Sequence, residues 1–202
     1  MTTISHYFSG HSLYAYLGLG ALLELADQTG VQIDHKPMDL HKVMEAAGSS
    51  PFEARNPDQL RYFFGVDASR WAEYRSVATM GRIPTHHMKS YDPVNKALIS
   101  AQVRDANIGP LALSLLRVHW SEDADLTDKD VLAGSLRLAG HNANEVLDAM
   151  DSDEIETLYE QNTQSAISQR VLGSPTYFVG DEMFYGQDRL ELLAWRLSKI
   201  AD

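Results

Sequence analysis

The hydrophobic and polar positions change their period along the chain. Residues 2–8 (TTISHYF) favour a strand, and apolar side chains then recur at helical spacing from Leu13 to Thr29. Gly30 is a natural end for that helix, and residues 31–40 (VQIDHKPMDL) alternate as a second strand would. A strand, a helix and a strand in succession predict a βαβ unit with two parallel strands and a right-handed crossover.

The central part of the chain, from about residue 41 to residue 170, has almost no such alternation and shows helical patterns instead. Its breaks carry turn-forming pairs such as Asn56-Pro57 and Asp92-Pro93. Thr127 is the expected N-cap of the helix that begins at residue 129. The predicted helices cover residues 60–64, 70–77, 94–106, 108–120, 129–139, 143–150 and 154–171.

The strand signal returns after Gly173. SPTYFV and EMFYG are predicted to be two short strands, joined by the hairpin-type turn Gly180-Asp181, and Gln187-Asp188 opens a last amphipathic helix. This order of elements predicts an α/β fold, namely a thioredoxin-like sheet (βαβ…ββα) with a large all-helical insertion. We expect residues 1–40 and 171–202 to form a discontinuous thioredoxin-like domain, and residues 41–170 to form the insertion.

The composition narrows the classes of function. The chain has 202 residues, a formal net charge of −11 and no cysteine. The negative charge disfavours nucleic acid or an anionic membrane as a partner, because either needs clustered Lys and Arg. Without cysteine, the chain's own residues supply no disulfide, thiolate metal site or CxxC redox chemistry. No signal peptide is visible and the apolar runs are too short to cross a bilayer, so we expect a cytoplasmic protein.

His11-Ser12 lies at the predicted N-terminus of the first helix. Unpaired N–H groups and the helix dipole stabilise an anion such as a thiolate there. The hydroxyl of Ser12 is a poor redox group but can donate a hydrogen bond to a thiolate. Two interpretations stay open: Ser12 only caps the helix, or it holds the sulfur of a thiol that the protein does not supply.

Two other chemistries are disfavoured. A hydrolytic Ser–His pair is disfavoured because no G-x-S-x-G elbow is present. No metal site is expected, because His86-His87 lack a third ligand at a recognisable spacing.

Two C-terminal stretches are further candidates. Ser174-Pro175 directly precedes a strand, which is consistent either with a trans proline at a strand start or with a cis bond in a tight turn. The cis geometry would expose backbone groups to an extended peptide-like ligand. Gln187 and Asp188 either cap the last helix or bind an amino-acid zwitterion, with N–H groups on its carboxylate and Asp188 on its ammonium.

Together these stretches resemble the 2-hydroxychromene-2-carboxylate isomerases, which belong with the kappa-class glutathione transferases and, more distantly, the Dsb-type disulfide oxidoreductases. The resemblance covers essentially the whole chain. It is strongest in GSPTYFVGDEMFYGQDRL, and weaker in DASRWA, Ile83-Pro84 and Pro93-Val94-Asn95. SLYAYLG matches the family pattern S-P-[aromatic]-S/A-[aromatic]-L, except that Leu13 stands where the family usually has proline.

The resemblance implies a role for each candidate residue. Ser12 is implied as the catalytic serine that assists bound glutathione, and Ser174 and Pro175 as the cis-proline loop that holds its cysteinyl part. Gln187 and Asp188 are implied at the γ-glutamyl end, with Asn56 in a supporting role.

The same resemblance implies a glutathione-dependent isomerase that acts on 2-hydroxychromene-2-carboxylate or a related aromatic unsaturated carboxylate, and a homodimer. The alternatives are a kappa-like glutathione transferase or peroxidase acting on a small electrophile, and a non-catalytic glutathione or peptide binder. A dithiol oxidoreductase is excluded by the absent cysteines. Residues 62–64 and Trp71 are candidates for an apolar pocket that takes an aromatic substrate.

Overall fold

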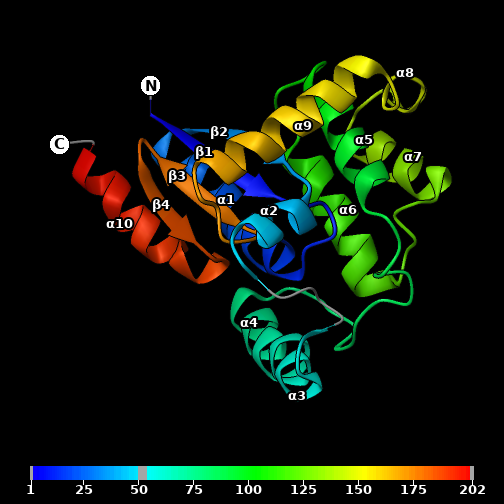
Figure 1. Cartoon of the computed structure of the whole chain (residues 1–202). Coiled ribbons are helices and arrows are strands. Elements are labelled where there is room, and N and C mark those ends of the chain that lie inside the picture. Colours follow the sequence, from blue (N-terminus) through cyan, green and yellow to red (C-terminus); the bar gives the residue numbers. More distant parts are fainter. Residues whose placement is uncertain (1, 50–53, 201–202) are drawn as a thin grey trace.

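The structure, a computed structural model, describes residues 2–49 and 54–200. Its strands form a mixed sheet in the order β2-β1-β3-β4 (Figure 1). β1 pairs with β2 in parallel, as the βαβ prediction requires, and with β3 in antiparallel orientation, while β3 and β4 form the predicted hairpin. The thioredoxin-like sheet is therefore confirmed. The strands are β1 (Thr3–Phe8), β2 (Gln32–Pro37), β3 (Thr176–Val179) and β4 (Glu182–Tyr185).

The remaining elements are helical, and most of them lie between β2 and β3, as predicted. None of the helices in the described ranges is long and apolar enough to cross a membrane. The helices are α1 (Leu13–Thr29), α2 (Leu40–Ala46), α3 (Pro57–Arg61), the π-helix η2 (Tyr62–Asp67), α4 (Ala68–Arg75), α5 (Asp92–Gln102), α6 (Gly109–Glu122), α7 (Lys129–Leu138), α8 (Ala143–Ala149), α9 (Asp153–Ser168), the 3₁₀-helix η3 (Gln187–Arg189) and α10 (Leu190–Ile200).

Helices cover both faces of the sheet. Side chains alternate along β1, so that Ile4 and Phe8 face the large core built with α1, α6 and α10. Tyr7 faces the other side, where it packs with Val43 of α2 and Ala166 of α9. Figure 1 shows α9 lying across this second face. The C-terminal end of β1 and the N-terminus of α1 are thereby held on a rigid, two-sided scaffold.

The segment α3–η2–α4 forms a small lobe beyond one end of the sheet (Figure 1). The sequence predicted two separate helices here, whereas the π-helical turn of η2 joins α3 and α4 into one run. Tyr14, in the first turns of α1, connects the lobe to the core, because its hydroxyl donates to Asp67 Oδ2 (2.8 Å) and to the backbone oxygen of Phe63 (3.1 Å). The lobe therefore stands beside the N-terminus of α1.

Helix ends were predicted well only where local chemistry sets them. α1 has the predicted bounds, and Gly30 ends it in the left-handed conformation (φ 67°). Thr127 as the N-cap of α7 was wrong, because Asp128 takes that place and its side chain accepts from the N–H of Asp130 (2.8 Å). α2 was missed. Its N-cap is Asp39, which lies inside the stretch predicted to be the second strand.

Candidate active site

Ser12 occupies the N-cap position of α1 and reaches the proline loop at the same time. Its Oγ accepts from the N–H of Ala15 (3.3 Å) and donates to the backbone oxygen of Ser174 (3.2 Å). Ser12 is buried, with 8% of its surface exposed. The donated contact to Ser174 is longer than the usual 2.5–3.0 Å of an O–H···O hydrogen bond, so the hydroxyl proton is only weakly held. The capping role is real, and it leaves the hydroxyl able to turn toward a ligand.

The proline loop has the conformation that the cis interpretation required. The Ser174-Pro175 peptide bond is cis. Ser174 Oγ accepts from the N–H of Ser9 (3.1 Å), and the oxygen of Pro175 accepts from the N–H of Gly186 (2.9 Å). Among the described residues, the N–H of Ser174 has no hydrogen-bond partner. The loop therefore joins the residues before α1 to those before η3, and it retains an unpaired backbone donor.

Gln187 and Asp188 begin η3, directly against α1. Gly18 of α1 permits this approach, because a Cβ at that position would lie 2.5 Å from Gln187 Cβ. Gln187 is buried, and its Nε2 has no partner among the described residues. Asp188 accepts from Arg189 Nη1 (2.8 Å) and keeps 39% of its side chain exposed. A buried amide with an unpaired donor and an accessible carboxylate thus occupy consecutive positions at the start of η3.

Arg75 of α4, which the sequence analysis did not single out, fixes Gln187 in place. Its Nε donates to Gln187 Oε1 (3.2 Å) and its Nη2 to the backbone oxygen of Gln187 (3.1 Å), while Nη1 pairs with Glu191 of α10 (2.9 Å). The guanidinium also lies 5.5 Å from the ring centre of Trp71. An arginine near the end of a predicted helix carries no sequence signal of such a role.

Asn56 lies at the start of α3, in the small lobe. Its side chain caps α3 by accepting from the N–H of Asp58 (2.8 Å), and it helps line an open hollow of about 330 Å³ with Arg55 and Phe63. Among the described residues, it forms no hydrogen bond with Ser12 or Gln187. The structure therefore brings Ser12, the proline loop and η3 together, and the role of Asn56 toward a ligand stays a prediction.

Asn95 of α5 holds the turn that leads into Ser12. It is fully buried, and its Oδ1 accepts from the N–H of Gly10 (2.8 Å). Its Nδ2 donates to Ser9 Oγ (3.2 Å) and to the oxygen of Met38 (3.0 Å). The turn is also closely packed, since a Cβ on Gly10 would lie 2.9 Å from Val94 Cγ2. One amide therefore anchors the segment between β1 and α1 to the helical insertion.

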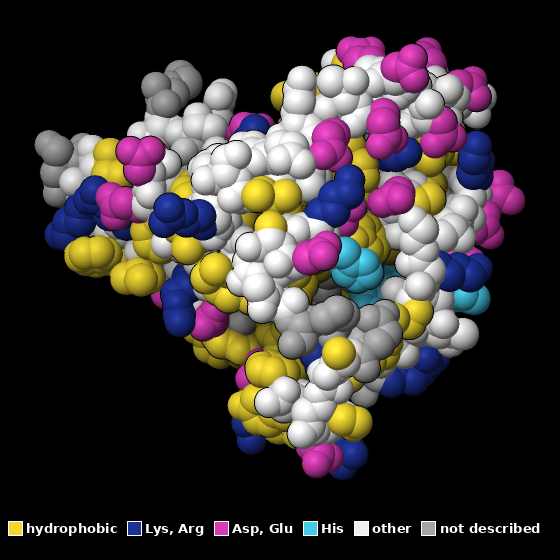
Figure 2. All heavy atoms as spheres, viewed as in Figure 1, with side chains coloured by type: hydrophobic (Ala, Val, Ile, Leu, Met, Phe, Trp, Pro, Cys, Tyr) yellow, Lys and Arg dark blue, Asp and Glu magenta, His cyan; other side chains and the backbone are white. Residues whose placement is uncertain are grey.

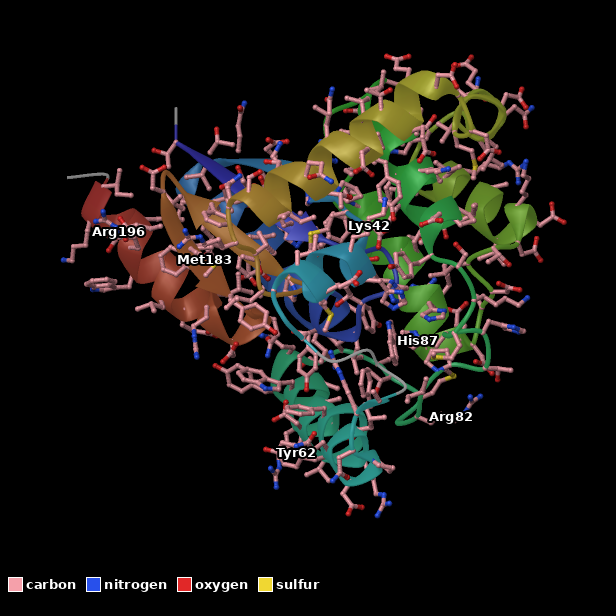
Figure 3. All side chains as sticks on the ribbon, viewed as in Figure 1. Lys42, Tyr62, Arg82, His87, Met183 and Arg196 are labelled. Carbon is pink, nitrogen blue, oxygen red and sulfur yellow. The ribbon has the colours of Figure 1, made fainter. Side chains whose placement is uncertain are left out.

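A cluster of histidines adjoins Ser12. The ring of His11 stacks on Tyr91, with 4.2 Å between ring centres, and lies 5.1 Å from the ring of His87. His87 Nδ1 lies 3.1 Å from Nε2 of the buried His119. Figure 3 places His87 beside the loop from β1 to α1, and Figure 2 shows histidine side chains at the surface near α2. His11 Nδ1 pairs with Ser9 Oγ (2.8 Å), and among the described residues His11 forms no hydrogen bond with the Ser12 hydroxyl.

Burial keeps these imidazoles neutral. It is the main cause that lowers the pKa of His11 well below its usual value and the pKa of His87 to about 4, and the neighbouring histidines act in the same direction. Burial also lowers the pKa of His119, although the Ala124 oxygen and two nearby aspartates oppose it. Other aromatic rings pack around His87. The ring centre of Trp120 lies 4.9 Å from that of His87, and the ring centre of Phe64 lies 6.3 Å from it. Tyr62 and Phe63, by contrast, lie at the surface.

Known proteins share this arrangement of elements. The chain is 28% identical over 192 residues to a protein from Pseudomonas sp. (strain C18) named 2-hydroxychromene-2-carboxylate isomerase, with 94% of this chain and 87% of that protein covered. A solved structure of 2-hydroxychromene-2-carboxylate isomerase matches with a TM-score of 0.86 at 24% identity, covering 98% of this chain and 96% of that one.

The Dsb-type proteins share the fold at lower similarity. The structure of the cytosolic disulfide reductase DsbM from Pseudomonas aeruginosa with GSH matches with a TM-score of 0.66 at 15% identity, covering 97% of this chain and 99% of that one. Residues 3–198 match the family described as the DSBA-like thioredoxin domain. Because this match covers nearly the whole sequence, the chain belongs to the DSBA-like thioredoxin domain family.

Proposed function

We propose that this protein is a glutathione-dependent isomerase that acts on 2-hydroxychromene-2-carboxylate or a related aromatic unsaturated carboxylate. Its family and its relatives' names support an enzyme of the isomerase or DsbA-like oxidoreductase kind. The sequence contains no cysteine, so its own residues cannot carry out dithiol exchange. The observation that carries the proposal is the hydroxyl of Ser12 at the N-terminus of α1, in contact with the proline loop.

The unpaired donors of the site suit glutathione. A tripeptide laid along the proline loop needs a backbone donor for its cysteinyl part, and the N–H of Ser174 has no partner among the described residues. Its γ-glutamyl carboxylate needs donors and its ammonium an acceptor, which the Nε2 of Gln187 and the carboxylate of Asp188 supply. The DsbM structure solved with GSH shows that a protein of this fold accommodates the tripeptide.

Glutathione bound here would supply a thiolate that adds reversibly to a conjugated substrate, so that a bond rotates before the thiolate leaves. The residues of the chain stabilise and orient. Ser12 Oγ–H turns from the oxygen of Ser174 toward the sulfur, and the first-turn N–H groups of α1 add their partial positive charge. A thiol pKa lowered by one unit corresponds to about 1.4 kcal/mol, which one hydrogen bond and a helix dipole can provide.

The proposal is tested by ultraviolet titration of the thiolate of bound glutathione in the wild type, in Ser12→Ala and in Ser152→Ala. Ser152 caps α9 through the same kind of contact, to the N–H of Ile155, and therefore controls for the loss of a helix cap. We expect a depressed thiol pKa in the wild type and in Ser152→Ala, and a value close to that of free glutathione in Ser12→Ala. An unshifted thiol in the wild type, or no binding, contradicts the proposal.

The substrate is tested by following the absorbance of 2-hydroxychromene-2-carboxylate with and without glutathione. We expect conversion to the benzylidenepyruvate isomer that requires glutathione and consumes none. Net consumption of glutathione would instead identify a transferase or a peroxidase. Binding of glutathione without conversion of any such substrate would identify a non-catalytic binder.

A further inference from the structure

Tyr185 ends β4, and its ring packs against the residue that precedes the proline loop. A Cβ on Gly173 would lie 3.1 Å from both the Cε2 and the hydroxyl oxygen of Tyr185, so the ring lies directly over the backbone of Gly173. The next residue, Gly186, donates its N–H to the oxygen of Pro175 (2.9 Å). Both the ring and the following peptide therefore hold Tyr185 beside the proline loop.

The surroundings of Tyr14 place Tyr185 near the N-terminus of α1 as well. Burial is the main cause that raises the pKa of Tyr14, followed by the neighbouring Asp67, and the nearby Tyr62 and Tyr185 act in the same direction. Because Coulomb interactions weaken with distance and with screening, such an effect requires that Tyr185 lie close to Tyr14. Tyr14 follows Ser12 by two positions, so Tyr185 adjoins both elements that meet at the Ser12 hydroxyl.

Tyr185 also lines an open hollow between β4, an edge strand of the sheet, and the start of α10. The hollow measures about 490 Å³. Tyr185 keeps 46% of its surface exposed, and its hydroxyl has no hydrogen-bond partner among the described residues. Figure 2 shows hydrophobic and basic side chains together over β4 and α10. The residues that line the hollow are Glu182, Met183, Phe184, Tyr185, Arg189 and Leu192.

This lining combines apolar surface with a cation. The side chain of Met183 is exposed and adds a thioether beside the aromatic ring. Arg189 is 51% exposed and pairs through Nη1 with Asp188, and the other N–H groups of its guanidinium remain able to bind a second carboxylate. The carboxylate of Glu182 is compensated, because it accepts from Arg196 Nε (2.7 Å). A flat aromatic molecule that carries a carboxylate fits this combination.

We propose that this hollow binds the aromatic carboxylate substrate, with Tyr185 packed against its aromatic ring and Arg189 paired with its carboxylate. The inference rests on the proposed function, from which the class of substrate is taken, and deepens it. A ligand that packs against Tyr185 lies next to the loop assigned to the cysteinyl part of glutathione. Tyr185 is then the residue that determines the preference for aromatic over aliphatic unsaturated carboxylates.

The first test measures binding by calorimetry and needs no turnover. The probes are cinnamate, crotonate, which lacks the aromatic ring, and cinnamamide, which lacks the charge. We expect the wild type to bind cinnamate more tightly than either of the other two. Tyr185→Leu should raise the Kd for cinnamate about fivefold and leave the Kd for crotonate unchanged, because it removes the ring and keeps an apolar side chain. Tyr185→Phe, which keeps the ring, should bind cinnamate as the wild type does.

Arg189→Gln tests the contribution of the charge. We expect the Kd for cinnamate to rise about tenfold and the Kd for cinnamamide to stay unchanged. Arg82→Gln is the matched control, because Arg82 is 54% exposed and also pairs with an aspartate, Asp123 (2.7 Å). Figure 3 places Arg82 and Met183 in different parts of the molecule. Trp195→Leu is the control for the ring, since this exposed side chain of α10 is not among those that line the hollow.

The second test compares the kinetics of chromene conversion with glutathione present. A contact that is equally strong in the ground state and the transition state changes KM and not kcat. We therefore expect Tyr185→Leu to raise KM about fivefold with kcat unchanged, and Tyr185→Phe to change neither. Thermal melting and size-exclusion chromatography check that each variant folds and keeps the oligomeric state of the wild type.

The outcomes separate this proposal from the proposed function. If the wild type binds glutathione with a depressed thiol pKa, but Tyr185→Leu and Arg189→Gln bind cinnamate as the wild type does, the assignment of the hollow is overturned and the proposed function stands. If cinnamate binding depends on both residues while glutathione does not bind, the hollow is supported and the proposed function is overturned. If Tyr185→Leu turns a dimer into monomers and leaves cinnamate binding unchanged, a second copy covers the hollow and the proposal is overturned.

Discussion

Arg75 and Gln187 lie 112 positions apart in the sequence, and the guanidinium of Arg75 donates to both carbonyl oxygens of Gln187. Only 12% of the Arg75 side chain is exposed. The helical insertion therefore determines how η3 presents Gln187 and Asp188, although both residues belong to the thioredoxin-like part of the chain. The part of the candidate site at η3 is therefore built jointly by a helix between β2 and β3 and by residues that follow β4.

Replacing Arg75 with methionine keeps much of its apolar stem and removes these donors. We expect the free energy of unfolding to fall by about 2 kcal/mol, because hydrogen bonds to a charged group contribute about 1.5–3 kcal/mol. We also expect the Kd for glutathione to rise about tenfold, since Gln187 is released. Denaturant unfolding and calorimetry measure the two effects. Arg61→Met, at a side chain that is 76% exposed, should change neither. A destabilised Arg75→Met with unchanged Kd would limit Arg75 to a structural role.

Asn95→Leu is expected to be strongly destabilising. The two side chains have the same number and branching of heavy atoms, but leucine leaves the N–H of Gly10 and the oxygen of Met38 without their partner in a fully buried place. Each unsatisfied buried group costs about 1–3 kcal/mol, so a loss of at least about 3 kcal/mol follows. Asn162→Leu removes one part-buried hydrogen bond, to the oxygen of Pro37, and should cost about 1 kcal/mol. Equal effects in urea unfolding would contradict the anchoring role of Asn95.

Ser114→Ala is expected to leave stability unchanged or to raise it by up to about 1 kcal/mol. The Oγ of Ser114 is buried and has no hydrogen-bond partner among the described residues, so the substitution removes a desolvated polar atom without breaking a bond. Ser100→Ala is the matched comparison. Its Oγ donates to the oxygen of Val146 (2.9 Å), and its loss should cost about 1 kcal/mol. A shift of the melting temperature in the same direction for both variants would refute the distinction.

The stability of the fold is expected to decrease below about pH 6.5, the usual pKa of an exposed histidine. His6 and His35 face each other across β1 and β2, with 3.0 Å between their Nδ1 atoms. Burial lowers the pKa of His35 to about 4, although the nearby Asp34 acts in the opposite direction. Burial, followed by the neighbouring His35, lowers the pKa of His6. Between about pH 4 and about pH 6.5 the unfolded chain binds more protons than the folded chain, so the free energy of unfolding rises with pH.

From about pH 6.5 to about pH 4, His35 alone should cost about 3 kcal/mol of stability. Urea unfolding at a series of pH values measures the slope. His35→Gln removes a buried titrating ring and should flatten the slope. A slope that is the same in the wild type and in His35→Gln would show that other groups cause the acid sensitivity.

The sequence predicted those features that are determined by residues close together in the chain. Ser12 and Gly30 delimit α1, and Gly180 begins the turn of the hairpin, so these were found. The meeting of Ser12 with Ser174, 162 positions away, followed from the predicted fold and the family resemblance, not from spacing. Arg75 and Asn95 could not be found in this way, because their roles depend on tertiary contacts across 112 and 85 positions.

The positions of the histidines also depend on contacts between residues that are far apart in the sequence. His87 and His119 carry no motif, and only the fold brings them beside His11. Conversely, Asn56 has a favourable local pattern before Pro57, and the structure uses it as the cap of α3. A pattern that a local role already explains gives no information on whether the residue also reaches a distant site.

Two of the contacts that join the proline loop to its neighbours use main-chain atoms in the loop: the oxygen of Ser174 accepts from the hydroxyl of Ser12, and the oxygen of Pro175 accepts from the N–H of Gly186. A third contact uses a side chain, because Ser174 Oγ accepts from the N–H of the buried Ser9. Every amino acid offers the same carbonyl oxygen at position 174. The side chain there is less free to vary, because only a residue with an acceptor atom in reach of Ser9 keeps all three contacts. A library of variants at position 174 would therefore retain this architecture mainly among side chains that carry such an acceptor.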